Sequence, residues 1–383
     1  MKPASVAAAK VTASPELLTV EWADGTASQF ASVWLRDNLP EDRDSHNRQR
    51  LIDVADLPPE PRIRDATLWQ SEVRVLWQQE ERHSKFSLAW LRQHRDSSVE
   101  SRGPTARTWF EGASLNARVD FAWRSLSVIR ADARERLRWL QRLLEDGIAF
   151  LSDVPPVEDA ILEAMGLIGR VAETNYGQVF DVRAVPQPEN LAYTDLGLGL
   201  HTDNPYREPV PGFQALHMLI AAPDGGESLF ADGFALAEQL RQTAPASFDI
   251  LTQTPVPFHY RSKTADLYAE RPLIQLSCDG VVSAVHYNNR SIAPVRLPAR
   301  ECSAFYAAYR RFAELLREPR FQAVTAMRAG DLVLFDNQRI LHGRKAFISA
   351  NHPRHLRGCY LTRDSIYSTA ALLQQQVAQE EHA

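Results

Sequence analysis

The sequence predicts a mainly β protein with flanking helices, in which a double-stranded β-helix (jelly-roll) domain follows a small β-rich N-terminal domain. Two observations support this fold class. Short apolar or alternating segments are frequent after residue 145 and do not alternate regularly with helices, which disfavours a doubly wound sheet. The first hundred residues contain two similar alternating segments, which indicate a separate small β unit.

Composition sets the broad class of the protein. The chain has 383 residues, of which 44% are hydrophobic and 24% charged, so it is long and apolar enough for one large and one smaller domain. A net charge of -5 and a pI of about 6.1 do not favour nucleic acid as a partner.

Cysteine usage and hydropathy bear on location. The three cysteines are widely spaced and odd in number, which predicts no disulfide framework and is consistent with a reducing cytoplasm. The apolar part of the N-terminal segment is too short for a signal peptide. No stretch approaches eighteen uninterrupted apolar residues, so we expect no membrane span and a cytoplasmic protein.

We expect three segments: a β-rich domain over 1–100, a linker over 101–112 and the jelly-roll domain over 113–383. In the first, residues 18–38 resemble residues 73–94, and each copy reads as two short strands followed by Trp-Leu-Arg. Asp24-Gly25 provides a hairpin turn in the first copy. The alternative is a chance resemblance between tryptophan-rich strands. Gly103-Pro104, in a polar stretch, marks the linker.

Helices and strands of the larger domain follow from apolar spacing. Leu137, Leu140 and Leu144 lie at helical intervals, and Gly147 provides a stop. Residues 148–151 then read as a buried strand. Further helices are predicted at 158–171, 234–242 and 303–316. Further strands are predicted at 214–220, 228–230, 273–276, 281–286, 331–335 and 356–361.

A potential metal site stands out within this strand-rich region. His201 and Asp203 are two residues apart, so both side chains point to one face of an extended strand. His342 follows an alternating strand and a polar turn, which makes it the best candidate for a third ligand. Two imidazoles and one carboxylate can hold Fe(II) on one face and leave the opposite positions open. The alternative for His201 alone is a hydrogen-bonded loop histidine.

Arg354 strengthens the interpretation of these residues as an oxygen-activating site. A guanidinium twelve residues beyond the last ligand can hold the distal carboxylate of 2-oxoglutarate bound to that iron. His217 lies in the apolar segment ALHML and is better explained as a packed strand residue.

With these residues, the chain resembles the γ-butyrobetaine hydroxylase family, within the taurine-dioxygenase-like Fe(II)/2-oxoglutarate oxygenases. The resemblance runs nearly end to end. Its markers are WLRDN (34–38), NYGQVFDV (175–182), NLAYTDLGLGLHTDNP (190–205), GGESLFADGF (225–234), FDNQRILHGR (335–344) and RHLRGCY (354–360).

The resemblance implies a cofactor set and an assembly. Iron is held by His201, Asp203 and His342. The co-substrate 2-oxoglutarate chelates the iron, pairs with Arg354 and receives a further hydroxyl from Ser228. With O2, its oxidative decarboxylation to succinate and CO2 drives a hydroxylation, and ascorbate keeps the iron reduced. A homodimer is expected.

The resemblance also implies a small trimethylammonium substrate. A quaternary ammonium has no N–H to donate and is best recognised by aromatic faces. The family's aromatic cage corresponds to Tyr176, Phe180, Tyr193 and Tyr360, with Phe180 in place of a tryptophan found in some members. The alternative is that Tyr176 and Phe180 are core aromatics.

The anionic end of the substrate corresponds to Asn190 and Asn288. Asn289 and Arg290 follow directly. A guanidinium suits a phosphonate better than amide donors do. We therefore place 2-(trimethylammonio)ethylphosphonate slightly ahead of γ-butyrobetaine as substrate. The alternative for Arg290 is a solvated loop arginine.

One departure from the family concerns zinc. Family members often carry a cysteine cluster after WLRDN that, with a histidine, binds structural zinc. This chain has His46 at about that position but no cysteine in the segment. We therefore expect no zinc site, and a small domain held by packing alone or by changed ligands.

Three other functions stay open from the sequence. Trimethyllysine is a third possible substrate, but no obvious residue accommodates its α-amino group. A non-catalytic jelly-roll that binds a betaine would not need the complete iron-ligand set. A zinc or manganese hydrolase would leave the placement of Arg354 unexplained.

Overall fold

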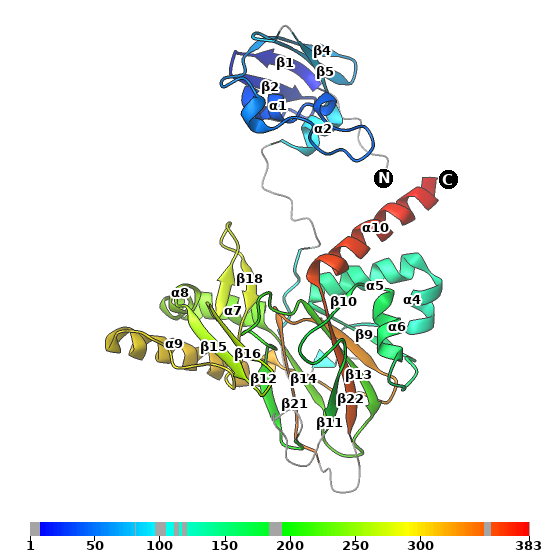
Figure 1. Cartoon of the computed structure of the whole chain (residues 1–383), viewed down its shortest axis with the longest axis vertical. Coiled ribbons are helices and arrows are strands. Elements are labelled where there is room, and N and C mark those ends of the chain that lie inside the picture. The colour runs from blue at the N-terminus through cyan, green and yellow to red at the C-terminus, as the bar shows by residue number, and fades with distance from the viewer. Residues whose placement is uncertain are drawn as a thin grey trace. The chain divides into compact units, whose positions relative to one another are not determined.

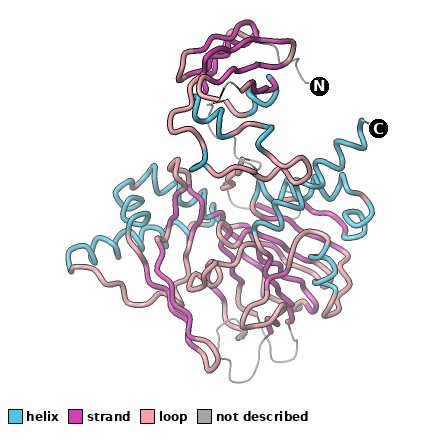
Figure 2. Tube along the Cα trace, turned by 45° about the horizontal axis from the view of Figure 1, so that its top comes forward, coloured by secondary structure: helices cyan, strands magenta, loops and turns pink. Residues whose placement is uncertain are grey.

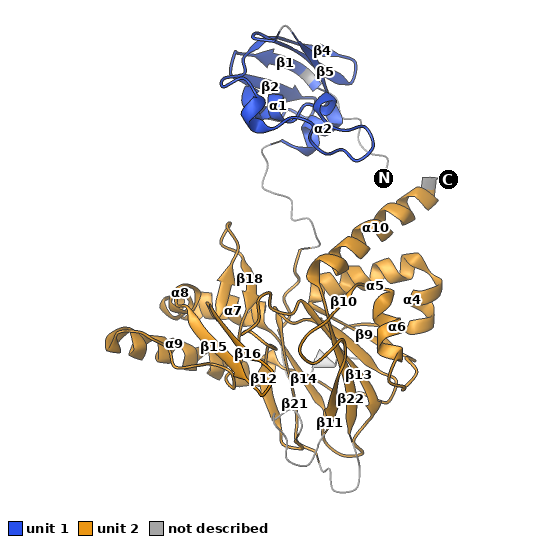
Figure 3. Ribbon diagram, in the orientation of Figure 1, with its two compact units in different colours: residues 1–102 blue, residues 103–383 orange. Residues whose placement is uncertain are grey.

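The computed structural model describes residues 8–80, 82–95, 105–110, 115–116, 121–183, 194–347 and 354–382. The chain divides into two compact units, Met1–Arg102 and Gly103–Ala383 (Figure 3).

The first unit contains the same arrangement twice. Strands β1 (Ala8–Ala13), β2 (Leu17–Trp22) and β3 (Ala27–Ala31) form one antiparallel sheet, which is followed by helix α1 (Ser32–Asp37). Strands β4 (Ile63–Trp69), β5 (Glu72–Trp77) and β6 (His83–Ser87) form the second, followed by α2 (Leu88–Gln93). Short 3-10 helices η1 (Pro40–Asp42) and η2 (Val54–Asp56) lie between the two copies. The faint sequence repeat therefore corresponds to a repeated structure.

Equivalent side chains stabilise the two copies in the same way. The indole Nε1 of Trp22 donates to Ser28 at 2.8 Å, and that of Trp77 donates to Ser84 at 2.9 Å. Both tryptophans are almost fully buried in one apolar cluster that draws on both sheets. Each hydrogen bond satisfies an indole N–H that burial would otherwise leave unpaired.

An ion-pair cluster joins helix α1 to the segment that follows it. Arg36 on α1 is 3% exposed and donates to Glu80 at 2.6 and 2.7 Å and to Asp42 at 2.6 Å. Arg82 donates to the other oxygen of Asp42 at 2.7 Å. These charge pairs join the two halves of the domain in addition to its apolar packing.

Two facing sheets form the second unit (Figures 1 and 2). The major sheet has the order β10-β22-β13-β20-β9-β8, with β11 also paired to β22. Its strands are β8 (Ala122–Ser125), β9 (Ile148–Ser152), β10 (Val171–Ala172), β11 (Phe180–Arg183), β13 (Phe213–Ile220), β20 (Leu332–Asp336) and β22 (His355–Leu361).

The minor sheet has the order β12-β21-β14-β19-β7. Its strands are β7 (Leu115–Asn116), β12 (Leu198–His201), β14 (Ser228–Asp232), β19 (Ala323–Thr325) and β21 (Ile340–Arg344). The fold class predicted from the sequence, a jelly-roll with a small β-rich N-terminal unit, is confirmed.

Side-chain alternation explains why the major sheet is buried on both faces. Phe150 of β9 and Phe335 of β20 point between the sheets, where Phe230 of the minor sheet meets them. Their strand neighbours Leu151 and Leu334 point to the opposite face, against helices. A strand covered on both sides needs an unbroken apolar run, as the sequence of β20 has.

Helices cover the outer faces of both sheets, and Figure 1 shows the two groups on opposite sides. The major sheet packs against α4 (Leu126–Ala131), α5 (Ala133–Asp146), α6 (Ala160–Gly166) and α10 (Arg363–His382). The minor sheet packs against α7 (Gly233–Thr243), α8 (Pro245–Gln253) and α9 (Ala299–Arg317).

The remaining elements lie in the long segment between β14 and β19. They are the hairpins β15 (Val256–Arg261) with β16 (Asp266–Arg271) and β17 (Ile274–Leu276) with β18 (Val282–Val285), and the 3-10 helix η4 (Pro319–Phe321).

The predicted helices differ from the observed ones in length and number. Gly147 ends α5 in the left-handed conformation, as expected, and Asp132, which was not predicted, caps its N-terminus. The helix predicted over 158–171 is shorter, since α6 ends at Gly166. Helices α1, α2, α4, α8 and α10 were not predicted. In the described part of the chain, no helix is both long and apolar enough to cross a membrane.

Candidate metal centre and active site

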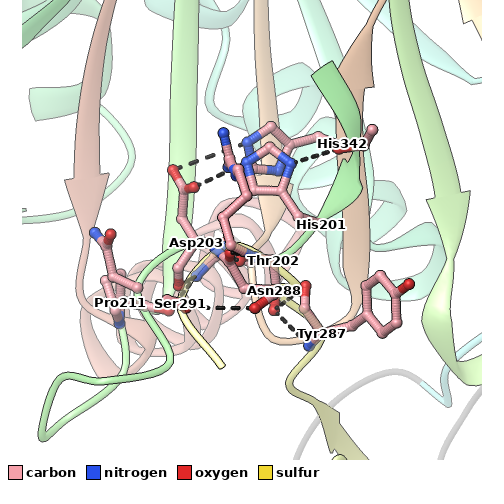
Figure 4. Close-up of polar contacts among 12 residues, drawn as sticks. His201, Thr202, Asp203, Pro211, Tyr287, Asn288, Ser291 and His342 are labelled. Carbon is pink, nitrogen blue, oxygen red and sulfur yellow. Dashed lines mark hydrogen bonds and ion pairs between the residues drawn. The ribbon is translucent and has the colours of Figure 1, made fainter. Parts of the chain in front are cut away.

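Three potential ligands meet at one end of the minor sheet. His201 ends β12 and lies directly opposite His342 on the neighbouring strand β21. Asp203 follows two residues after His201, and its carboxylate faces both imidazoles (Figure 4). The Nε2 atoms of His201 and His342 lie 3.2 and 3.8 Å from the Asp203 oxygens. Among the described residues, this is the one group of three or more potential ligands within metal-binding reach.

Protonation at this site fits a divalent cation. The Nδ1 of His201 lies 2.9 Å from the carbonyl of Gly199, which fixes the N–H there and leaves the Nε2 lone pair facing Asp203. Burial, and then the nearby His201, lower the pKa of His342 to about 3, so it is neutral. Burial opposes the charge of Asp203, but the two histidines and Tyr360 hold its pKa below the usual range.

Such an arrangement needs a positive charge at its centre. Two imidazole lone pairs directed at a carboxylate repel it, and a bound cation converts that repulsion into coordination. The donor set, two histidines and one carboxylate on one side, fits Fe(II) with positions left open.

Buried Asn337 fixes the main chain of Asp203. Its Oδ1 accepts from the Asp203 N–H at 2.7 Å, and its Nδ2 donates to the Asp203 carbonyl at 3.0 Å. Asn337 lies in the turn before β21, which carries His342. It therefore ties two ligand-bearing segments together, and the sequence analysis did not single it out beyond noting a polar turn.

The adjacent residue is fixed from the other side. Thr202 exchanges hydrogen bonds with the main chain of Tyr287, with N–O distances of 2.8 and 3.0 Å (Figure 4). The side-chain amide of Asn288 donates to the Thr202 carbonyl at 3.0 Å. The loop after β18 thus supports the His-x-Asp segment.

A cavity that is open to solvent extends from the ligands between the two sheets. Inward-pointing residues of both sheets line it, including Gln214, Leu216, Leu356, Ser228, His342 and Arg344. The cavity is the continuation of the apolar core to the open end of the sandwich, where polar side chains replace the phenylalanines.

Arg354 lies buried in the cavity wall and is 4% exposed. Burial and the neighbouring Arg344 lower its pKa to about 10, which leaves it positively charged at neutral pH. Its side chain passes beside Gly226, where a Cβ atom would lie 3.0 Å from Arg354. Two adjacent guanidinium groups favour an anion in the cavity, which fits the distal carboxylate of 2-oxoglutarate. Ser228 lines the same cavity.

Aromatic rings form another part of the wall. The centre of the Phe180 ring lies 5.1 Å from the centre of the Tyr360 ring and 6.3 Å from the centre of the Tyr176 ring. Glycine is required at position 358, because a Cβ there would lie 2.4 Å from the Phe180 ring. Of the four predicted cage residues, these three line the cavity together.

Further aromatic residues extend this group. Tyr206 stacks on Tyr260 with ring centres 5.1 Å apart, and Tyr260 lies 6.3 Å from Tyr176. Neither tyrosine was predicted, although Tyr206 stands only three residues after Asp203. The position of this tyrosine next to a predicted metal ligand in the sequence could have indicated that it lies near the site.

The residues predicted to bind the substrate's anionic end are not all brought together. Arg290 lines the cavity, whereas Asn288 is occupied by the Thr202 backbone. Asn289 accepts a hydrogen bond from Tyr309 at 2.9 Å and lines a second cavity, next to α9. Asn190, and the fourth cage residue Tyr193, lie outside the described residues.

The fold and the site define a metal-dependent jelly-roll oxygenase, and family comparison agrees. Residues 114–360 match the taurine catabolism dioxygenase TauD, TfdA family, and residues 9–92 match the γ-butyrobetaine hydroxylase-like N-terminal family. The chain belongs to the TauD/TfdA family of Fe(II)/2-oxoglutarate dioxygenases. The resemblance stated from the sequence motifs is thereby confirmed.

Individual relatives share most of their length with this chain. The γ-butyrobetaine dioxygenase of Pseudomonas sp. (strain AK-1) is 36% identical over 365 residues, which cover 93% of this chain and 94% of the relative. The mitochondrial trimethyllysine dioxygenase of Rattus norvegicus is 29% identical, covering 91% and 83%. Among solved structures, a taurine dioxygenase from Burkholderia xenovorans is 17% identical with a TM-score of 0.45, covering 66% of this chain and 90% of its own.

Proposed function

We propose that this protein hydroxylates γ-butyrobetaine to carnitine in a reaction that consumes 2-oxoglutarate and O2. The observation that carries this proposal is the meeting of His201, Asp203 and His342 with buried Arg354 and an aromatic wall in one cavity. The bound iron, 2-oxoglutarate and O2 would supply the oxidising chemistry.

The protein's own side chains hold and orient the reactants. Arg354 would bind the distal carboxylate of 2-oxoglutarate, and Ser228 would add a hydroxyl donor beside it. Tyr176 and Phe180 would receive the trimethylammonium group against their ring faces. By holding both molecules in place, these groups would convert a reaction between separate molecules into an effectively unimolecular one.

Comparison with the relatives changes the order in which the possible substrates were ranked from the sequence. The sequence analysis placed 2-(trimethylammonio)ethylphosphonate slightly ahead, but the 36% identical relative is a γ-butyrobetaine dioxygenase. This likeness supports the carboxylate substrate better than the phosphonate. Trimethyllysine dioxygenases of other organisms are 25–29% identical, so trimethyllysine is also placed behind γ-butyrobetaine.

One observation favours the phosphonate as the second candidate. Arg290 lines the cavity, and its guanidinium makes no hydrogen bond with the part of the chain that the structure describes. Burial lowers the pKa of Arg290, and the charge of Asp203 partly offsets this. A guanidinium directed at the cavity would bind a dianionic phosphonate more strongly than a carboxylate.

Succinate formation with each substrate tests the proposal. The Fe(II)-loaded enzyme would receive 2-oxoglutarate, O2 and one of the three trimethylammonium compounds, and mass spectrometry would detect a product heavier by one oxygen atom. We expect the highest kcat/KM with γ-butyrobetaine. A higher kcat/KM with the phosphonate would replace the leading proposal by the second candidate, and no succinate with any compound would refute both.

Arg290→Gln separates the two candidates further. Arg310→Gln on the exposed face of α9 is the matched control, because Arg310 does not line the cavity. If the phosphonate is the substrate, Arg290→Gln should raise its KM roughly 30-fold or more, as expected for loss of a charged hydrogen-bond partner. If γ-butyrobetaine is the substrate, we expect Arg290→Gln to raise the KM for γ-butyrobetaine by a smaller factor.

A further inference from the structure

The hydroxyl of Tyr360 makes a contact that an aromatic cage does not require. Its ring lies in the cavity wall next to Phe180, while its Oη donates to Oδ2 of Asp203 at 2.8 Å. The other oxygen, Oδ1, lies 3.2 Å from Nε2 of His201, whereas Oδ2 lies 3.8 Å from Nε2 of His342. One side chain therefore borders the substrate cavity and also contacts a predicted iron ligand.

Tyr360 belongs to a directed chain of hydrogen bonds. Tyr206 donates its hydroxyl to Oδ1 of Asn204 at 2.6 Å. The Nδ2 of Asn204 donates to the Tyr360 hydroxyl oxygen at 3.0 Å. Since Asn204 supplies a donor to that oxygen, the proton of Tyr360 is left to point at the carboxylate, which only accepts.

Burial keeps this chain in place. Tyr360, Asn204 and Tyr206 are 4%, 6% and 6% exposed, so water does not replace the hydrogen bonds at low cost. Asn204 also adopts a φ of 53°, a left-handed conformation that asparagine tolerates better than most residues.

We propose that Tyr360 is a positioning residue with two separable roles: its ring bounds the substrate cavity, and its hydroxyl binds Oδ2 of Asp203 and so leaves Oδ1, the oxygen that faces His201, as the stronger donor to the metal. This inference rests on the proposed function for the presence of the metal, but not on the identity of the substrate. A carboxylate that uses one oxygen leaves more open positions on the metal for 2-oxoglutarate and O2 than one that uses two.

Tyr360→Phe tests the hydroxyl and leaves the ring in place. Hydrogen-bond partners of metal ligands change metal affinity about 10- to 100-fold when removed. We therefore expect the dissociation constant for Fe(II), measured anaerobically by calorimetric titration, to rise by about that factor. The substrate KM should change less than about threefold, because the aromatic face stays.

Two further variants make the result specific. Tyr360→Leu removes ring and hydroxyl and should weaken both Fe(II) binding and substrate binding. Tyr306→Phe removes a hydroxyl from a residue that is 51% exposed on α9, and should leave the Fe(II) dissociation constant within twofold of the wild-type value.

The outcomes separate this inference from the proposed function. If wild type binds Fe(II) and makes succinate, but Tyr360→Phe binds Fe(II) within twofold of wild type, the positioning role is refuted and the proposed function stands. If wild type binds Fe(II) but forms no succinate with any trimethylammonium compound, the proposed function falls, while a weakened Tyr360→Phe still supports the positioning role. If wild type does not bind Fe(II), both are refuted.

Discussion

Replacing Arg36 with methionine should lower the unfolding free energy of the N-terminal unit by about 3 kcal/mol. Methionine keeps most of the apolar stem but removes the guanidinium. Glu80 then loses two hydrogen bonds, at 2.6 and 2.7 Å, and Asp42 loses one at 2.6 Å.

The magnitude follows from the burial of the partners. Removing one partner of a buried ion pair costs about 3–5 kcal/mol, because the remaining charge is left desolvated. Asp42 keeps Arg82 at 2.7 Å, and the Glu80 side chain is 26% exposed, so water offsets part of the loss. The lower end of that range therefore applies. For a unit of this size, about 3 kcal/mol corresponds to a fall in Tm of about 12–24 °C.

Calorimetry of the full chain measures this transition, and Arg50→Met provides the control. Arg50 also makes a bidentate pair, with Asp37, but its side chain is 47% exposed, so its loss should cost less than about 1 kcal/mol. Equal Tm values for the two variants would refute the reasoning. A chelator should leave the transition unchanged, since we expect ion pairs and not zinc to stabilise this unit.

Three other predictions concern the second unit. Arg354→Met should raise the KM for 2-oxoglutarate roughly 30-fold or more in steady-state assays, since a buried charged partner is lost; an unchanged KM would contradict its role. Phe180→Leu keeps the apolar volume but removes the ring face, and should raise the KM of the trimethylammonium substrate about 2- to 30-fold while the KM for 2-oxoglutarate stays constant. His286 is buried, and burial and Arg271 lower its pKa to about 3, below the ordinary 6.5. The unfolded state therefore binds a proton that the folded state does not as pH falls below 6.5, so stability declines there, by about 1.4 kcal/mol per pH unit. Urea unfolding of His286→Gln at pH 7.5 and 5.5 should show a smaller decline than wild type, and equal declines would contradict this assignment.

Local sequence patterns were enough for the fold class and for the chemical identity of the site. The apolar run of β20 and the helical leucines of α5 are periodicities that each segment carries by itself. His201 and Asp203 share a face because strand geometry places residues two apart on one side. The lower helical amphipathicity of α10, which is rich in glutamine, explains why it was not predicted.

The tertiary structure alone decided what each polar side chain contacts. Asn337 holds the main chain of Asp203 from 134 positions away, and Asn288, predicted as a substrate residue, instead binds Thr202. The Tyr360 hydroxyl meets Asp203 across 157 positions. A residue's chemical type is local information, whereas its partner is set by which strands pair and in what register. Those contacts form only when distant segments are brought together, so the sequence specified the donors and acceptors, and the packing of the two sheets chose among them.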